Sequence, residues 1–182
     1  MIAALLLLLG ALCAWMTVHP YTTYQLSLAA LRRFVPARDP KLTGPQRPRK
    51  FAICTCAYNE EGIIEEKAQN LMALKQRYPG LDILIYVDAA TDNTANILRR
   101  YENEFRIVIA TERHGKTHGM NRLVAMSDAD IVIFTDANVM LDMEVIERLA
   151  ARFADPTIGC VCGNLIYTNA ADSSMAQTGS FY

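Results

Sequence analysis

The feature that most constrains the fold is a regular alternation of short apolar runs with longer segments of helical periodicity. The apolar runs have the length of buried strands and occupy residues 51–57, 81–87, 105–110, 130–135 and 158–162. The segments between them repeat apolar residues every three or four positions and occupy residues 63–77, 92 or 94 to 103, 117–126 and 144–153. Strands that alternate with such helices need crossover connections, so the sequence predicts an α/β fold with a mostly parallel sheet flanked by helices.

The N-terminal region has a different composition. Residues 2–18 carry no charge and approach the ~20 residues that a helix needs to cross a bilayer. Trp15 and Tyr21 lie where amphipathic aromatic residues favour the membrane interface. A cleaved signal peptide is the alternative, but it would carry basic residues before the apolar run, and only Met1 precedes it. We therefore expect residues 1–34 to form an uncleaved transmembrane helix and an interfacial helix.

Basic residues are distributed unevenly around this apolar run. None precedes it, and those that follow are Arg32, Arg33, Arg38, Lys41, Arg47, Arg49 and Lys50. The positive-inside rule then places the rest of the chain in the cytoplasm, after a single N-terminal span. Residues 24–34 are apolar with two arginines, which fits a helix on the membrane surface or one packed on a second membrane helix. Residues 35–50 contain four prolines, so we expect a linker before a domain at residues 51–182.

Composition limits the possible partners and metal sites. A chain of 182 residues with a formal charge of -1 suits one domain with a small appendage and gives no field that attracts nucleic acid, so no nucleic-acid partner is expected. The pairs Cys54/Cys56 and Cys160/Cys162 lie inside apolar runs, whereas zinc-binding pairs usually lie on turns. We favour core thiols in a reducing compartment over a zinc site.

Polar residues follow three of the predicted strands. They are Tyr58-Asn59-Glu60-Glu61, Asp88 and Asp136-Ala137-Asn138. In a parallel sheet these turns lie at the same edge, where ligands bind. Carboxylate and amide oxygens there would suit a divalent ion and the base of a nucleotide. The alternative for each residue is a turn or helix cap, with Asp136 capping a helix that starts near Leu141.

A basic segment precedes the third predicted helix. Gly115 permits a close backbone approach, and Lys116 at a helix N-terminus suits a phosphate, although an exposed lysine is the simpler interpretation. Asn121 lies five residues further on. Neither a Walker loop nor a G-x-G-x-x-G motif is present. His114 and His118 at four-residue spacing would share a helix face and suit a metal, but the sequence shows no third ligand nearby.

Four motifs together resemble those of the family 2 glycosyltransferases, in the same order and at similar spacings. They are "CAYNEE" from Cys56, "YVDAATDNT" from Tyr86, "HGKTHGMN" from His114 and "FTDAN" from Phe134. The resemblance implies a GT-A fold and the inverting transfer of a sugar from a nucleotide-sugar donor, usually a UDP-sugar. It also implies Mg²⁺ or Mn²⁺, which neutralises the departing diphosphate. An anchored, cytoplasm-facing member is similar to enzymes whose acceptor is a saccharide or a lipid-linked molecule.

The same resemblance assigns roles to individual residues. Residues matching Ala57, Tyr58 and Glu60 line the base and ribose pocket, and the acid matching Asp88 contacts the base. This turn departs from the usual D-G-S-T-D sequence because Ala89 replaces the glycine.

Two motifs of the resemblance concern binding of the donor's phosphates. The lysine matching Lys116 lies near the nucleotide, and the D-x-D motif, here 136–138, binds the ribose and the metal-diphosphate. Asn138 replaces the second acid, so weaker metal binding is expected. The expected donor-binding residues are Ala57, Tyr58, Asn59, Glu60, Asp88, Lys116, Asn121 and Asp136, and the expected metal ligands are Asp136 and Asn138.

No catalytic base can be assigned from the sequence. Family members place an Asp or Glu base beyond the donor-binding half, and an inverting transfer needs one. We expect this base beyond Tyr182, and therefore a truncated chain that is inactive alone. The alternative is a non-catalytic nucleotide-sugar-binding or scaffolding protein of a membrane synthase. A nucleotidyltransferase of similar fold would carry a glycine- and arginine-rich phosphate loop, which "AYNEEG" does not supply.

Overall fold

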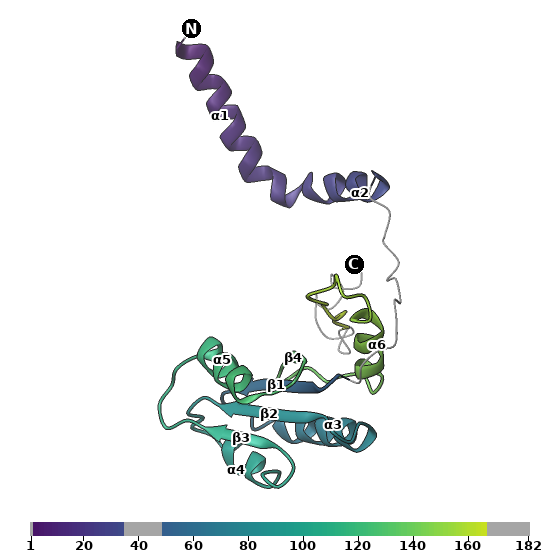
Figure 1. Ribbon diagram of the computed structural model, residues 1–182. Helices are drawn as coiled ribbons and strands as arrows, with labels where there is room; N and C mark the ends of the chain where they lie inside the picture. The colour runs from purple at the N-terminus through teal and green to yellow at the C-terminus, as the bar shows by residue number, and fades with distance from the viewer. Residues whose placement is uncertain (1, 35–48, 167–182) are drawn as a thin grey trace. The chain divides into compact units, whose positions relative to one another are not determined.

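The computed structural model describes residues 2–34 and 49–166 (Figure 1). The chain divides into two compact units, Met1–Lys41 and Leu42–Tyr182. The predicted linker at 35–50 lies mostly outside the described residues, as does the end of the chain from residue 167.

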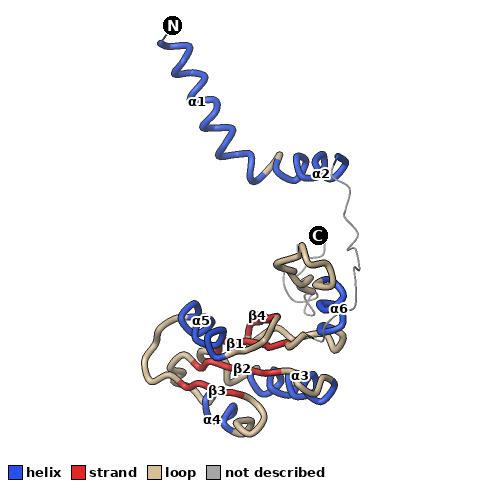
Figure 2. The backbone as a smooth tube through the Cα atoms, in the orientation of Figure 1, coloured by secondary structure: helices blue, strands red, loops and turns tan. Residues whose placement is uncertain are grey.

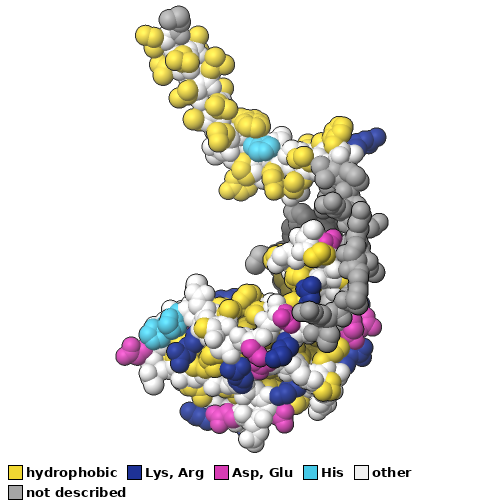
Figure 3. Space-filling view, in the orientation of Figure 1, with side chains coloured by type: hydrophobic (Ala, Val, Ile, Leu, Met, Phe, Trp, Pro, Cys, Tyr) yellow, Lys and Arg dark blue, Asp and Glu magenta, His cyan; other side chains and the backbone are white. Residues whose placement is uncertain are grey.

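The N-terminal unit consists of the helix α1 (Ile2–Val18), a short 3-10 turn η1 (His19–Tyr21) and the helix α2 (Tyr24–Phe34). None of the residues of α1 is buried, and its visible face is covered with hydrophobic side chains (Figure 3). Residues Ile2–Tyr21 form a helix whose 20 residues and mean hydropathy of 2.1 are sufficient to cross a membrane. A signal sequence has the same properties, so the helix agrees with both interpretations of the N-terminus.

The second unit is built on a four-stranded parallel sheet (Figure 2). Its strands are β1 (Phe51–Ala57), β2 (Asp82–Val87), β3 (Arg106–Ile109) and β4 (Ile131–Asp136), in the order β3-β2-β1-β4. In the ladder, Cys56 pairs with Tyr86 on one side and with Asp136 on the other. The predicted parallel α/β fold is therefore confirmed, and all four strands end at the same edge.

Helices cover both faces of the sheet (Figure 1). The larger core lies under α3 (Ile64–Arg77), α4 (Thr94–Arg99) and α6 (Val145–Arg152), where Leu71, Leu98 and Ile146 join residues such as Ile53 and Ile85 of the strands. The smaller core lies under α5 (Lys116–Met126), where Leu123 packs on strand residues such as Cys54 and Leu84. These residues alternate along β1 and β2 with those of the larger core, because successive side chains of a strand point to opposite faces. The alternation of the two cores explains why the strands are apolar throughout.

Gly119 allows α5 to lie unusually close to the sheet. A Cβ atom at this position would lie 2.5 Å from a ring carbon of Tyr86 and 2.7 Å from the sulfur of Cys56. Both distances are below van der Waals contact, so a larger residue would require Tyr86 or Cys56 to move. The first turn of α5, which carries Lys116, is thereby held near the ends of β1 and β2.

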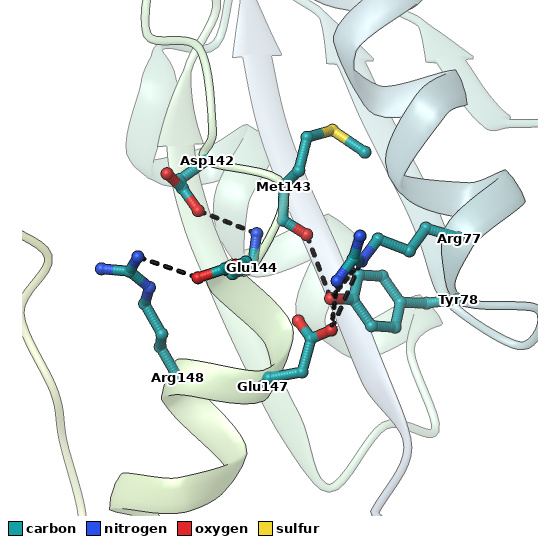
Figure 4. Close-up of polar contacts among 7 residues, drawn as sticks. All are labelled: Arg77, Tyr78, Asp142, Met143, Glu144, Glu147 and Arg148. Carbon is teal, nitrogen blue, oxygen red and sulfur yellow. Dashed lines mark hydrogen bonds and ion pairs between the residues drawn. The ribbon is translucent and has the colours of Figure 1, made fainter.

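A cluster of polar contacts joins the C-terminus of α3 to the beginning of α6 (Figure 4). Nη2 of Arg77 lies 3.0 Å from Oε1 of Glu147, and the Tyr78 hydroxyl donates to the Met143 carbonyl at 3.0 Å. The Glu144 N–H donates to Oδ1 of Asp142 at 2.8 Å. The helix after β4 thus begins at Val145, and Asp142 bonds the backbone just before it. The alternative in which Asp136 caps a helix near Leu141 is wrong.

Two expectations about the end of the domain are also wrong. Residues 158–162 form no strand, because this short run pairs with no strand that the structure describes and is followed by Gly163. Cys160 and Cys162 are consequently exposed, whereas Cys54 is buried as expected. Burial raises the pKa of the Cys54 and Cys56 thiols to about 11, so both stay protonated at neutral pH.

Candidate functional site

Asp88 connects the end of β2 to the segment that leads into α5. Its carboxylate accepts hydrogen bonds from the backbone N–H groups of His114 at 2.8 Å and Gly115 at 2.9 Å. Its own N–H donates to the carbonyl of Ala57 at 3.0 Å. Only 4% of Asp88 is exposed, and Gly115 has a φ of 87°, which a residue with a side chain rarely adopts. The carboxylate is therefore fixed by two backbone N–H groups of the segment before α5, and the Asp88 backbone is bonded to the end of β1.

Asn59 connects the turns that follow β1 and β2. Its Oδ1 accepts a hydrogen bond from the Thr91 N–H at 2.8 Å, and its Nδ2 donates to the Thr91 hydroxyl at 3.1 Å. The Glu60 N–H donates to the Thr94 hydroxyl at 2.8 Å. Asn59 and Ala89 both have a φ of 53°, the left-handed conformation that asparagine tolerates better than alanine. The amide of Asn59 is thus engaged in holding the two turns together, as in the capping alternative.

Arg113 is a residue that the sequence reasoning missed. Its guanidinium carbon lies 3.9 Å from the centre of the Tyr58 ring, a cation–π arrangement, and its Nε lies 4.0 Å from the Asp88 carboxylate. Tyr58 is half-buried and Ala57 is buried. We call residues 57–60, 88 and Arg113 the β1–β2 corner. It combines an aromatic face, a fixed carboxylate and an exposed basic side chain.

The end of β4 forms the other part of the site. The Lys116 ammonium pairs with Oδ1 of Asp136, and the two side chains are 59% and 54% exposed. Asn138 is exposed in the turn that follows. We call Lys116, Asp136 and Asn138 the β4 corner. Because its charged groups are open to solvent and bonded mainly to each other, they can rearrange when a ligand arrives.

Two residues of α3 contact the segment after β4, and the sequence reasoning missed both. Lys67 is 0% exposed, and its ammonium donates to the Thr135 hydroxyl at 3.1 Å and to the Val139 carbonyl. Burial lowers the pKa of Lys67 to about 8, and the nearby charge of Asp136 opposes this shift. Asn70 bonds both the N–H and the carbonyl of Leu141, each at 2.9 Å. A lysine within the apolar stripe of a helix was the signal that would have revealed this contact.

Asn121 and the histidines are less closely connected to the site. Asn121 lies exposed on α5, and its side chain makes no hydrogen bond within residues 49–166. The rings of His114 and His118 lie 4.6 Å apart and, with Tyr86 and Arg122, line a pocket of about 210 Å³. The described part of the chain offers no third His, Cys, Asp or Glu to make these two a metal site.

The β4 corner offers oxygen ligands to the expected divalent ion but not a full set. Within the described residues no three His, Cys, Asp or Glu groups come together, so the chain alone does not build a complete coordination shell. Mg²⁺ and similar ions, however, bind through one or two carboxylates and complete their shell with substrate phosphates and water. The Asp136 carboxylate already holds a cation, the ammonium of Lys116. Asp136 and Asn138 therefore fit an ion that is held jointly with a phosphate ligand.

Comparison with known proteins identifies the family. The model of the glycosyl transferase family 2 matches residues 52–181. This chain belongs to that family. The beta-monoglucosyldiacylglycerol synthase of Synechocystis sp. is 30% identical over 152 residues, which cover 76% of this chain and 31% of the relative. The poly-beta-1,6-N-acetyl-D-glucosamine synthase of Staphylococcus epidermidis is 25% identical over 122 residues, covering 65% of this chain and 29% of the relative.

Solved structures support the GT-A-like fold of this family 2 member. A mannosyltransferase from Pyrobaculum calidifontis, solved with GDP-Man and Mn²⁺, has a TM-score of 0.66 and 25% identity, covering 85% of this chain and 47% of that chain. TarS residues 1–349 from S. aureus, solved with UDP, has a TM-score of 0.51 and 22% identity over 56% of this chain and 31% of that chain. The second similarity concerns the fold alone. The chain spans about 30% of the length of the curated relatives named above.

Proposed function

We propose that this chain is the nucleotide-sugar-binding part of a membrane-anchored glycosyltransferase. The observation that carries the proposal is the meeting of Asp88, Lys116 and Asp136 at one edge of the sheet in a family 2 member. The donor is a UDP-sugar, and the acceptor is a saccharide or a lipid-linked molecule at the cytoplasmic face of the membrane. The proposed parts are an anchor and interfacial helix at 1–34, a linker at 35–50 and the donor-binding domain at 51–182.

In this proposal the β1–β2 corner binds the base and the ribose. Tyr58 offers a ring edge and Arg113 a planar guanidinium, and both groups suit the flat surface of a base. The two oxygens of Asp88 already accept backbone hydrogen bonds, which fixes their direction before the donor binds. Each carboxylate oxygen has a second lone pair, so Asp88 can also accept an N–H group of the base.

The β4 corner binds the diphosphate. Lys116 exchanges its pairing with Asp136 for pairing with the phosphates, and Asp136 then turns to the divalent ion, with Asn138 as a neutral oxygen ligand. The ion, when bound, neutralises charge on the departing diphosphate. The remaining charge of the diphosphate is met by Lys116, which lies at the first position of α5, where the helix dipole also favours an anion.

Calorimetry on the full chain in detergent tests the donor site. We expect UDP to bind, Mn²⁺ to strengthen the binding, and Asp136→Ala to abolish the effect of Mn²⁺. Asp128→Ala is the matched control, because Asp128 is also an exposed aspartate paired with a lysine, Lys50, but lies near the start of β4. A parallel titration with GDP shows whether the site prefers uracil to guanine. UDP binding that is indifferent to both Mn²⁺ and Asp136 would contradict the proposal.

The membrane placement has its own test. Tyr24, Leu28 and Leu31 lie on one side of α2 and are exposed, which fits a helix that lies in the bilayer interface. Cys160 and Cys162 are exposed thiols of the domain. We expect a membrane-impermeant maleimide to label them in broken cells but not in intact cells, with the Cys160→Ser/Cys162→Ser double variant as the control. Labelling in intact cells would place the domain outside.

A further inference from the structure

Two side chains of α3 hydrogen-bond the segment that carries Asp136 and Asn138. Lys67 donates to the hydroxyl of Thr135 and to the carbonyl of Val139, and Asn70, three residues along α3, holds both backbone groups of Leu141. We call Lys67 and Asn70 the α3 clamp. No other side chain of α3 hydrogen-bonds residues 135–141 in the described structure.

The position of these contacts along the segment is informative. Thr135 immediately precedes Asp136, and Val139 immediately follows Asn138. A single ammonium group therefore joins the two ends of the turn that contains both expected metal ligands. Asp136 still pairs with Cys56 in the β1–β4 ladder, and Ala137 is buried in the core. Outside that ladder, the backbone–backbone hydrogen bond of the turn among the described residues runs from the Val139 N–H to the Asp136 carbonyl at 3.3 Å.

Packing alone does not account for a lysine at position 67. Its neighbours on the buried side of α3 are Ile64, Ala68 and Leu71, each 0% exposed. An apolar side chain of similar length would fill the same space, whereas a buried ammonium loses its hydration and lowers its pKa, as Lys67 does. A polar group that is unfavourable in the core but bonded to a candidate binding segment indicates a role in that segment.

We propose that Lys67 is a positioning residue for diphosphate binding. Together with Asn70 it holds the backbone of the 136–138 turn in one conformation, so that only the side chains of Asp136 and Asn138 have to turn toward the diphosphate and its ion when the donor arrives. Lys67 is buried and acts through the turn, not by touching the donor. This inference rests on the proposed function for the identity of the ligand, but the effect of the clamp on the turn does not depend on it.

The proposal separates two parts of the donor. Uridine carries only the base and the ribose, which the proposed function assigns to the β1–β2 corner, whereas UDP adds the diphosphate that the β4 corner and its ion bind. A residue that positions the β4 corner affects UDP and leaves uridine unchanged. A residue that only stabilises the fold changes neither affinity under conditions in which the protein remains folded.

The experiment compares Lys67→Met and Asn70→Ala with the wild-type full chain. Leu74→Ala is the matched control, because Leu74 is as fully buried on the same helix as Lys67 but has an apolar side chain that makes no hydrogen bond to the turn. Hydrogen exchange of residues 136–141 is measured without ligand, and the affinities for UDP and uridine are measured with Mn²⁺ present.

We expect faster exchange of 136–141 in both clamp variants and a fall in UDP affinity of about tenfold or more, with uridine affinity unchanged. Leu74→Ala should lower stability without changing the ratio of the two affinities. Equal exchange in the wild type and both variants, or an equal loss of UDP and uridine affinity, would overturn the proposal. If the wild type binds no UDP, the proposed function fails, while the exchange rates still decide whether the clamp holds the turn. If Lys67→Met does not fold, Asn70→Ala provides the same comparison.

Discussion

The β1–β2 corner and the β4 corner lie at the same edge of the sheet but are built differently. In the first, an aspartate side chain that is 6% exposed is fixed by backbone N–H groups of a neighbouring segment. In the second, the carboxylate is 54% exposed and bonded to a lysine side chain, and the turn is held from beneath by α3. A rigid corner suits a part of the ligand that does not react, because its side chains are already ordered and binding does not have to order them. An adjustable corner suits groups whose charge changes during the reaction.

The largest expected effect concerns Asp88. Replacing it by alanine removes the carboxylate that accepts from two part-buried backbone N–H groups, and hydrogen bonds to a charged group contribute about 1.5–3 kcal/mol each, so we expect a loss of about 4 kcal/mol in the free energy of unfolding. Urea unfolding of Asp88→Ala measures this loss, with Asp128→Ala as an exposed control. Equal stability of the two variants would show that the β1–β2 corner is not rigid in the way described.

The second prediction concerns pH and the support beneath the β4 corner. The pKa of Lys67 is lowered from 10.5 to about 8, with burial as the main cause. Between these pH values the unfolded chain keeps a proton that the folded chain has released, so the free energy of unfolding increases as pH rises. We expect the wild type to gain about 3 kcal/mol relative to Lys67→Met across this window. Unfolding curves at several pH values measure the gain, and parallel pH profiles would contradict it.

A smaller effect is expected at the turn after β2. Ala89 has a φ of 53°, which costs a residue with a Cβ atom about 1–2 kcal/mol and costs glycine little. Ala89→Gly should therefore raise the free energy of unfolding by about 1 kcal/mol. Ala90→Gly, at a neighbouring position without a positive φ, should give no gain. A stabilisation of similar size at both positions would assign the effect to something other than the left-handed backbone.

The smallest effect on stability is expected in the β4 corner itself. The Lys116–Asp136 pair is exposed, so Lys116→Met should change the free energy of unfolding by less than about 0.5 kcal/mol. The same variant should lower UDP affinity about tenfold, because it removes a charged partner of the diphosphate. Thermal unfolding and calorimetry on the same sample measure the two effects. A large loss of stability in Lys116→Met would show that the β4 corner supports the fold as the β1–β2 corner does, and would contradict the difference between them.

The sequence predicted the sheet and the edge that carries the site because apolar periodicity and strand-end residues are local signals. Asp88 and Asp136 were predicted at this edge in this way and Lys116 from its place at a helix N-terminus, and the structure places all three there, while their role in binding stays a prediction. Lys67 was not predicted, because a lysine in a helix normally points to solvent, and its acceptors lie 68 and 72 residues away. Arg113 was missed for a similar reason, since its partner Tyr58 follows another strand. The wrong strand at 158–162 shows that an apolar run does not by itself specify a pairing partner.

The missing side chain of Gly119 sets how closely α5 approaches the ends of β1 and β2. If α5 were pushed outward by a methyl group, Lys116 at its first position would move away from the strand ends, although nothing at the ligand itself had changed. The side chains at positions 56, 86 and 119 share one space, so a larger residue at one of them requires a smaller residue at another. A variant library made to select for new donors should change these three positions together, with their summed side-chain volume kept constant, before it changes any residue that faces the nucleotide.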